Sequence, residues 1–136
     1  MSTSPNRDLV VKALTELFVD GDTGALDRYW SGDDYIQHSP QIPNGVDGLR
    51  RFLTGANVTY EIGFAAGTGD IVMVHGRFTG PTPKPLIAVD IFRVIDGKIT
   101  EHWDVLQEEV TDTASGNPMF DPAEAETSGI YVSTGG

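Results

Sequence analysis

A β-hairpin is predicted by residues 86–107, which read Leu-Ile-Ala-Val-Asp-Ile-Phe-Arg-Val-Ile-Asp-Gly-Lys-Ile-Thr-Glu-His-Trp-Asp-Val-Leu-Gln. Two β-rich runs flank Asp96-Gly97, and Asp-Gly suits the left-handed dihedral angles of the tight turns that match strand twist. The arms of this hairpin also carry ionisable residues where a plain core strand would have Val or Ile: Asp90, His102 and Asp104.

Side chains two positions apart share one face of a strand. In the first arm, Asp90 therefore shares a face with Ala88, Phe92 and Val94, and in the second arm His102 and Asp104 share one with Leu106. The opposite face of the second arm is expected to carry Ile99, Glu101, Trp103 and Val105. Both faces mix apolar with ionisable groups, which predicts a curved sheet with one face around a half-polar cavity.

Composition bounds the possible functions. With 136 residues, one domain is expected, and a hydrophobic content of 39% excludes a disordered body. A net charge of -11 disfavours nucleic acid and anionic membranes as partners. The lack of cysteine excludes disulfides, zinc-thiolate sites and a thiol nucleophile. No apolar run reaches the length of a membrane span and residues 1–6 lack a signal-peptide core, so a cytoplasmic protein is expected.

The remaining pattern predicts helices before strands. Helical spacing covers residues 5–20, 23–30 and 46–54, residues 35–40 are expected to be extended, and strands follow at 58–65 and 71–78. This order predicts an α+β domain over residues 1–110, with helices on one side of a curved antiparallel sheet. Residues 111–136 form a Gly- and Ser-rich tail, either partly disordered or an arm anchored by isolated apolar residues. These are Met119, Phe120, Ile130 and Tyr131.

Several motifs together resemble the SnoaL-like polyketide cyclases of the nuclear-transport-factor-2-like superfamily, which also contains the ketosteroid isomerases. They are Tyr35-Ile-Gln-His-Ser-Pro, then Gly45, Gly48 and Phe52, and Val89-Asp-Ile-Phe-Arg-Val-Ile-Asp-Gly-Lys-Ile-Thr-Glu-His-Trp-Asp. Residues 117–120, Asn-Pro-Met-Phe, look like a tail motif of a subgroup described as predicted aldol-condensation enzymes. The resemblance implies a cone-shaped sheet wrapped by helices around an apolar pocket, and commonly a homodimer.

The resemblance also suggests catalytic residues. Asp90 matches the protonated aspartic acid that helps hold the enolate oxygen in ketosteroid isomerases, and His38 falls where those enzymes keep their carboxylate base. Their tyrosine in the first helix has no counterpart at residues 10–14. SnoaL-like cyclases use an aspartate on the cone wall as acid and base, and Asp104 is the candidate for it, with Asp90 as the alternative.

We expect further residues to line the pocket and contact substrate: His75, His102, Tyr35, Phe92, Leu106 and Trp30. The expected reaction is enolate chemistry on a small or mid-sized hydrophobic carbonyl compound, an aldol-type cyclisation or an isomerisation, without a cofactor. No metal is expected either, because the three histidines show no His-x-His or His-Glu-x-x-His spacing.

Two alternatives to this enzyme remain. One is a binding module of the same fold for a hydrophobic ligand or another subunit. The other is an epoxide hydrolase, whose Asp-Arg-Asp relay would need Arg77 or Arg93 between Asp90 and Asp104.

Overall fold

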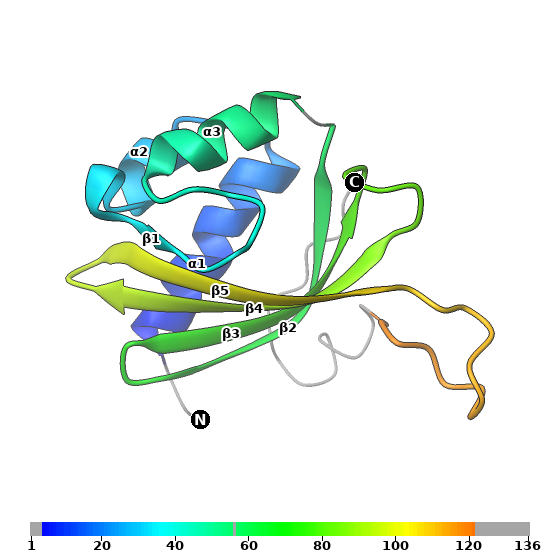
Figure 1. Ribbon diagram of the computed structural model, residues 1–136. Helices are drawn as coiled ribbons and strands as arrows, with labels where there is room; N and C mark the ends of the chain where they lie inside the picture. Colours follow the sequence, from blue (N-terminus) through cyan, green and yellow to red (C-terminus); the bar gives the residue numbers. More distant parts are fainter. Residues whose placement is uncertain (1–3, 56, 122–136) are drawn as a thin grey trace.

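The computed structural model describes residues 4–55 and 57–121 as an α+β fold built on one curved sheet (Figure 1). The sheet has five strands in the order β1-β5-β4-β3-β2. They are β1 (Ile36–Gln37), β2 (Thr59–Thr68), β3 (Ile71–Thr79), β4 (Leu86–Ile95) and β5 (Lys98–Glu108). β1 runs parallel to β5, and the other neighbouring strands are antiparallel. The predicted fold class is confirmed.

The hairpin between β4 and β5 turns at Asp96 and Gly97, whose φ angles are 50° and 77°. Positive φ at both central residues is typical of the two-residue turn that follows strand twist, so the predicted hairpin is confirmed. Its register places Asp90 opposite Asp104. The two aspartates therefore lie side by side on one face of the sheet.

One expected alternation in this hairpin is wrong. The register shifts between Arg93 and Val94, so that Val94 pairs with Ile99. A bulge of this kind breaks the two-residue alternation of a strand. Ile99 is consequently buried in the core instead of sharing the face of Glu101.

Three α-helices lie over one face of the sheet, which we call the inner face (Figure 1). They are α1 (Pro5–Leu14), α2 (Ala25–Tyr29) and α3 (Val46–Gly55), with a π-helical turn η1 (Thr15–Val19) directly after α1 and a 3-10 turn η2 (Gly32–Asp34) before β1. The side chain of Ser4 accepts a hydrogen bond from the Arg7 N–H and caps α1, and Pro5 begins it. None of the helices in the described part of the chain is long and apolar enough to cross a membrane.

The core lies between the helices and the inner face. Val10 and Leu26 of the helices are fully buried there, together with Val72 and Val74 of β3. Burying each of these side chains contributes roughly 1.5–3 kcal/mol to folding. This packing fixes the direction in which the inner-face side chains of β4 and β5 point.

The opposite face, which we call the outer face, receives part of the C-terminal segment. Phe120 returns to β2 and is only 4% exposed, and a Cβ added to Gly63 would come within 2.8 Å of its ring. The Arg77 guanidinium lies 4.8 Å from the centre of the same ring. The anchor expected at Phe120 therefore contacts the body of the fold, whereas Ile130 and Tyr131 fall outside the described residues.

Candidate active site

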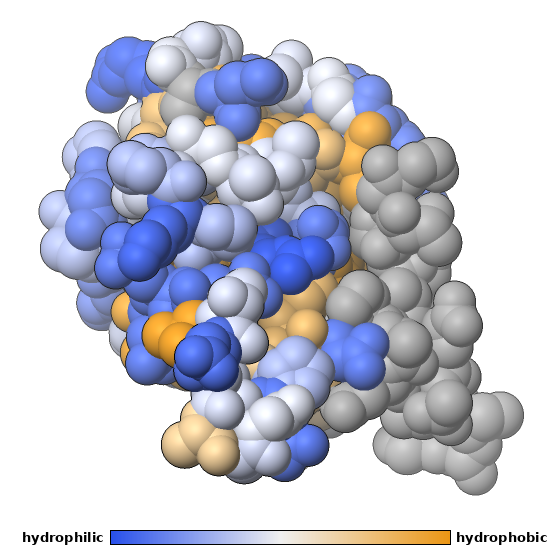
Figure 2. Space-filling model, turned by 90° about the vertical axis from the view of Figure 1, so that its right-hand side faces the viewer, coloured by the Kyte–Doolittle hydropathy of each residue, from blue (hydrophilic) through white to orange (hydrophobic). Residues whose placement is uncertain are grey.

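A cavity of about 260 Å³ opens between the inner face and the helices. Most of its wall is apolar, with Leu14, Leu17 and Phe18 from α1 and η1, Leu49, Phe52 and Leu53 from α3, and Phe78, Leu86, Phe92 and Leu106 from the sheet. Figure 2 turns toward the viewer the end of the molecule that carries the 80–85 loop, where apolar atoms show between hydrophilic side chains. Pro81 and Thr82 of that loop also line the cavity.

The polar part of the wall comes from three neighbouring strands or strand ends. β4 contributes Asp90, β5 contributes His102 and Asp104, and β1 contributes Gln37. β1 runs parallel to β5, and their register places Gln37 opposite His102. The pairing of distant segments thus concentrates the ionisable groups at one end of an otherwise apolar cavity.

These side chains form a continuous hydrogen-bonded chain. Gln37 Oε1 lies 2.6 Å from His102 Nδ1, and His102 Nε2 lies 2.8 Å from Asp90 Oδ1. Tyr60 donates its hydroxyl hydrogen to Asp90 Oδ2 at 3.1 Å. Asp90 is 2% exposed, and such a buried carboxyl group is costly unless its oxygens find partners. Here both oxygens have one.

Tyr60 reaches Asp90 because Gly76 leaves room for its ring. A Cβ added to Gly76 would lie 2.4 Å from the Tyr60 hydroxyl oxygen, closer than real Cβ atoms approach. Burial raises the pKa of Tyr60 well above its ordinary value, and the nearby Asp90 charge acts in the same direction. The hydroxyl therefore stays protonated and acts as a donor.

Asp104 completes the cluster: it lines the cavity and is half-buried, whereas Asp90 and His102 are buried. Burial raises the pKa of Asp104 above its ordinary value, partly opposed by the charge of His102, while the charge of Asp90 raises it further. A carboxyl group of raised pKa that borders an apolar cavity is a candidate for exchanging protons with a bound molecule.

Asp90, His102 and Asp104 are also the described residues that come closest to a metal-binding set, since one donor atom of each lies within 4.8 Å of the others. The hydrogen bonds described above already satisfy His102 Nε2 and both oxygens of Asp90. The cluster is thus complete as a hydrogen-bonded unit, and we assign no metal to it.

Residues 11–102 match the model of the SnoaL-like domain. The chain belongs to this family. No curated protein matches it. The expected membership of the SnoaL-like family is therefore confirmed.

Solved structures support the same fold. An NTF2-like protein from Cytophaga hutchinsonii is 17% identical with a TM-score of 0.65, and 79% of this chain and 95% of that chain align. TsrD from Streptomyces laurentii is 18% identical with a TM-score of 0.63 over 79% and 92% of the two chains. A candidate polyketide cyclase from Bacillus cereus is 26% identical with a TM-score of 0.57 over 71% of each chain.

Seven of the residues predicted for this SnoaL-like site line the cavity, and an eighth, His38, does not. The cavity is lined by Asp104, Asp90, His102, Tyr35, Phe92, Leu106 and Trp30, but not by His38. Strand alternation is the reason, because Gln37 points inward and the next side chain points outward. His38 is exposed, lies 2.7 Å from Glu101 Oε2 and stacks on Trp103. The expectation that it is a pocket residue is corrected.

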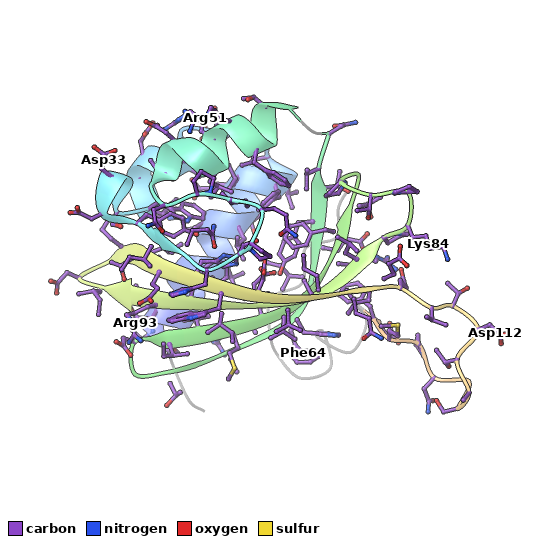
Figure 3. All side chains as sticks on the ribbon, viewed as in Figure 1. Asp33, Arg51, Phe64, Lys84, Arg93 and Asp112 are labelled. Atoms are coloured by element: carbon purple, nitrogen blue, oxygen red, sulfur yellow. The ribbon has the colours of Figure 1, made fainter. Side chains whose placement is uncertain are left out.

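His75, which was also expected to line the pocket, does not do so. On β3, Val74 and Gly76 are buried against the inner face, so His75 between them points to the outer face. There it stacks on Phe64, with ring centroids 4.8 Å apart. Figure 3 shows Phe64 on the side of the sheet away from the helices.

Neither arginine considered for an epoxide hydrolase relay reaches the cavity. Arg77 pairs with Glu61 and Glu109 at 2.8 and 3.2 Å. Arg93 pairs with Asp70 and Glu101 at 2.7 and 3.1 Å, and it points away from the helices in Figure 3. The Asp-Arg-Asp arrangement is therefore not formed by these residues.

Sequence reasoning missed five polar residues that line the cavity: Gln37, Ser39, Gln41, Tyr60 and Thr82. Tyr60 of β2 donates its hydroxyl hydrogen to Asp90, whereas the first helix contains no tyrosine. The motif Tyr-Ile-Gln-His-Ser contained a usable signal, because an extended segment with buried Tyr35 also turns residues 37 and 39 inward.

Proposed function

We propose that this SnoaL-like protein is an enzyme that acts on a small or mid-sized carbonyl compound through an enolate, by aldol-type cyclisation or isomerisation. The observation that carries the proposal is the half-buried Asp104, with its raised pKa, beside the Asp90–His102–Tyr60 cluster in an apolar cavity. Family membership supports the same class of chemistry.

In the proposed reaction, Asp104 is the base. Its carboxylate removes a proton from the carbon next to the carbonyl group, and the electron pair moves onto the carbonyl oxygen as an enolate. A base positioned in this way contributes typically about 10²–10⁴ in rate. The resulting carboxylic acid then returns its proton, either to another carbon in an isomerisation or to the new hydroxyl oxygen after an aldol addition.

The hydrogen-bonded cluster would stabilise the charge on the oxygen. The hydrogen between His102 Nε2 and Asp90 Oδ1 lies in a region shielded from water, and the enolate oxygen would compete for it while Tyr60 keeps its hydrogen bond to Asp90. Donors fixed in advance in such a region are worth more than in water, and one of them contributes roughly 10²–10³ in rate.

The cavity also limits the substrate. Its volume of about 260 Å³ lies just under the range of about 300–1,000 Å³ typical of ligand pockets. Among the described residues that line it there is no Lys or Arg, whereas two are aspartates. We therefore propose an uncharged, largely hydrophobic substrate whose polar end is the carbonyl group.

A ligand-binding module of the same fold is the second candidate. The observation that favours it is that Asp90, His102, Gln37 and Tyr60 satisfy one another without a ligand. In this case the polar cluster would only orient a bound molecule, and Asp104 would exchange no proton with it.

We also propose that the protein forms a homodimer through the outer face. Exposed apolar side chains gather there, with Phe64 42%, Met73 44% and Val105 66% exposed. Met73 lies opposite Ile91, which lies opposite Trp103, so the apolar band crosses three strands. Sedimentation equilibrium should give twice the chain mass for the wild type and a single chain mass for Met73→Asp. A monomeric wild type would contradict this.

Exchange of α-protons tests the proposed reaction. The protein is incubated in heavy water with a panel of uncharged ketones and β-keto esters, and proton NMR follows the loss of the α-proton signal. Exchange by the wild type that disappears in Asp104→Asn supports the enzyme. Exchange that is equal in both variants contradicts the role of Asp104, and binding without exchange favours the second candidate.

A further inference from the structure

The hydrogen bonds around Gln37 determine where His102 carries its proton. The amide oxygen Oε1 of Gln37 accepts the backbone N–H of Ser39 at 3.1 Å. On the other side, the amide nitrogen Nε2 donates to the Tyr35 hydroxyl at 3.3 Å. A backbone N–H is always a donor, so it would oppose the –NH₂ group if the amide were turned over. This contact therefore fixes the orientation of the amide.

The same oxygen lies 2.6 Å from His102 Nδ1. An amide oxygen has no hydrogen to give, so the hydrogen of this bond belongs to Nδ1. A neutral imidazole carries one N–H hydrogen. With that hydrogen on Nδ1, the Nε2 atom of a neutral His102 would present only its lone pair to Asp90.

Asp90 Oδ1 lies 2.8 Å from Nε2, a hydrogen-bond distance. Two lone pairs would repel each other at this distance, so one further proton lies between the two atoms. The second oxygen of Asp90 does not supply it, because that oxygen accepts from Tyr60. Whether the shared proton is nearer Oδ1 or nearer Nε2, His102 and Asp90 together carry no net charge.

We propose that Gln37 is a positioning residue, which holds the hydrogen of His102 on Nδ1 so that His102 and Asp90 share one transferable proton as an uncharged pair. This deepens the proposed function and rests on it for its catalytic meaning. Asp104 takes the substrate proton, and the pair, within 4.8 Å of Asp104 by its donor atoms, gives one to the enolate oxygen. No net charge is created by the two transfers together.

Without the acceptor at residue 37, His102 would place its one hydrogen on Nε2 and donate it to an ionised Asp90. His102 and Asp90 together would then have a net charge of one negative unit, close to Asp104. The other titratable groups that line this cavity, Tyr35 and Tyr60, are uncharged tyrosines that do not offset it. The added negative charge would make Asp104 harder to ionise.

The direct test is long-range ¹H–¹⁵N correlation NMR of the histidine side chains, recorded without substrate near pH 7. The chain has three histidines, so His38 and His75 provide internal controls. In the wild type we expect Nδ1 of His102 to be protonated. A His102 that carries hydrogen on Nε2 alone would overturn the proposal, whatever the catalytic result.

Two variants at one position separate positioning from packing. Gln37→Leu removes the acceptor and should move the hydrogen to Nε2, whereas Gln37→Glu keeps an acceptor oxygen and should keep Nδ1 protonated. The same form of His102 in both variants would overturn the proposal. If α-proton exchange is present, the rising limb of its pH profile should move up in Gln37→Leu by about one pH unit, so that the rate below the limb falls about tenfold. Absence of exchange in the wild type would contradict only the proposed function.

Discussion

The inner and outer faces of the hairpin carry carboxylates in opposite environments. Glu101 and Asp104 lie three positions apart on β5, so strand alternation turns Glu101 outward and Asp104 toward the cavity. Hydrogen bonds from His38 and Arg93 lower the pKa of Glu101, whereas burial raises the pKa of Asp104. Of the two carboxyl groups, only Asp104 combines a raised pKa with a place in the cavity wall, which makes it the candidate acid or base.

The carboxyl groups of the two faces differ in the side chains that surround them. On the outer face each arginine of β3 and β4 pairs with two carboxylates, so every one of these charged groups has a partner of opposite sign, and the groups lie close to solvent. On the inner face the acidic groups Asp90 and Asp104 have a histidine and hydroxyl groups as neighbours instead. Ion pairs give the outer charges a structural role, and the inner cluster, which neither arginine reaches, is where we propose that proton transfer takes place.

Gly76→Ala should have the largest effect on stability. The new Cβ would overlap the end of the Tyr60 side chain, and Tyr60 is held by Phe78 and Phe18, with ring centroids 4.3 and 5.4 Å away. Overpacking of this kind costs about 1–3 kcal/mol. Urea unfolding should show this loss, while Gly55→Ala, at a glycine with open space around it, should be close to neutral. Equal stability of the two variants would contradict the packing described.

Tyr60→Phe should lower the free energy of unfolding slightly less than Gly76→Ala does. Its comparison with Arg93→Gln tests the difference between the inner and outer faces. It leaves the buried Asp90 Oδ2 without its donor, which costs roughly 1–3 kcal/mol. Arg93→Gln on the outer face breaks two ion pairs, but exposed pairs of this kind contribute only about 0–1 kcal/mol each. A larger loss for Arg93→Gln in urea unfolding would reverse the comparison.

Asp104→Asn should have the smallest effect on stability, and the effect should depend on pH. Because the pKa of Asp104 is raised in the folded protein, its ionisation costs stability as pH rises from the ordinary value of 3.8 through the folded value. The amide does not ionise, so the variant should melt at a higher temperature than the wild type at pH 7. The advantage should vanish below about pH 4. A variant that is less stable at pH 7 would contradict the raised pKa.

Much of this fold was predictable because its local signals agree with one another. Asp96-Gly97 fixed the hairpin, and the spacing of Leu9, Ala13 and Leu17 indicated the first helix. Strand alternation also placed His102 and Asp104 on one face of the second arm, and Asp90 and Phe92 on one face of the first arm, since each position could be counted from a recognisable turn. The register between the two arms then brings both sets to the same face of the sheet. The direction of these side chains could be predicted because their positions relative to the Asp96-Gly97 turn are visible in the sequence.

The rest depended on pairing between distant segments. Tyr60 and Asp90 are 30 positions apart, and their contact requires both the β2–β3–β4 register and the space at Gly76. His38 was assigned by resemblance, but its strand is short and lacks a turn from which its direction could be counted. The bulge in β5 at Thr100, opposite the step from Arg93 to Val94, similarly moved Ile99 to the core without a signal in the sequence.

The most direct test of the account is a pair of matched substitutions in the α-proton exchange assay. Asp104→Asn and Glu101→Gln each replace a carboxylate by an amide on the same strand, one on each face. We expect the first to lower exchange by about 10²–10⁴ and the second to change it less than about twofold. Equal effects of the two substitutions, or a larger loss for Glu101→Gln, would contradict the assignment of the chemistry to the inner face.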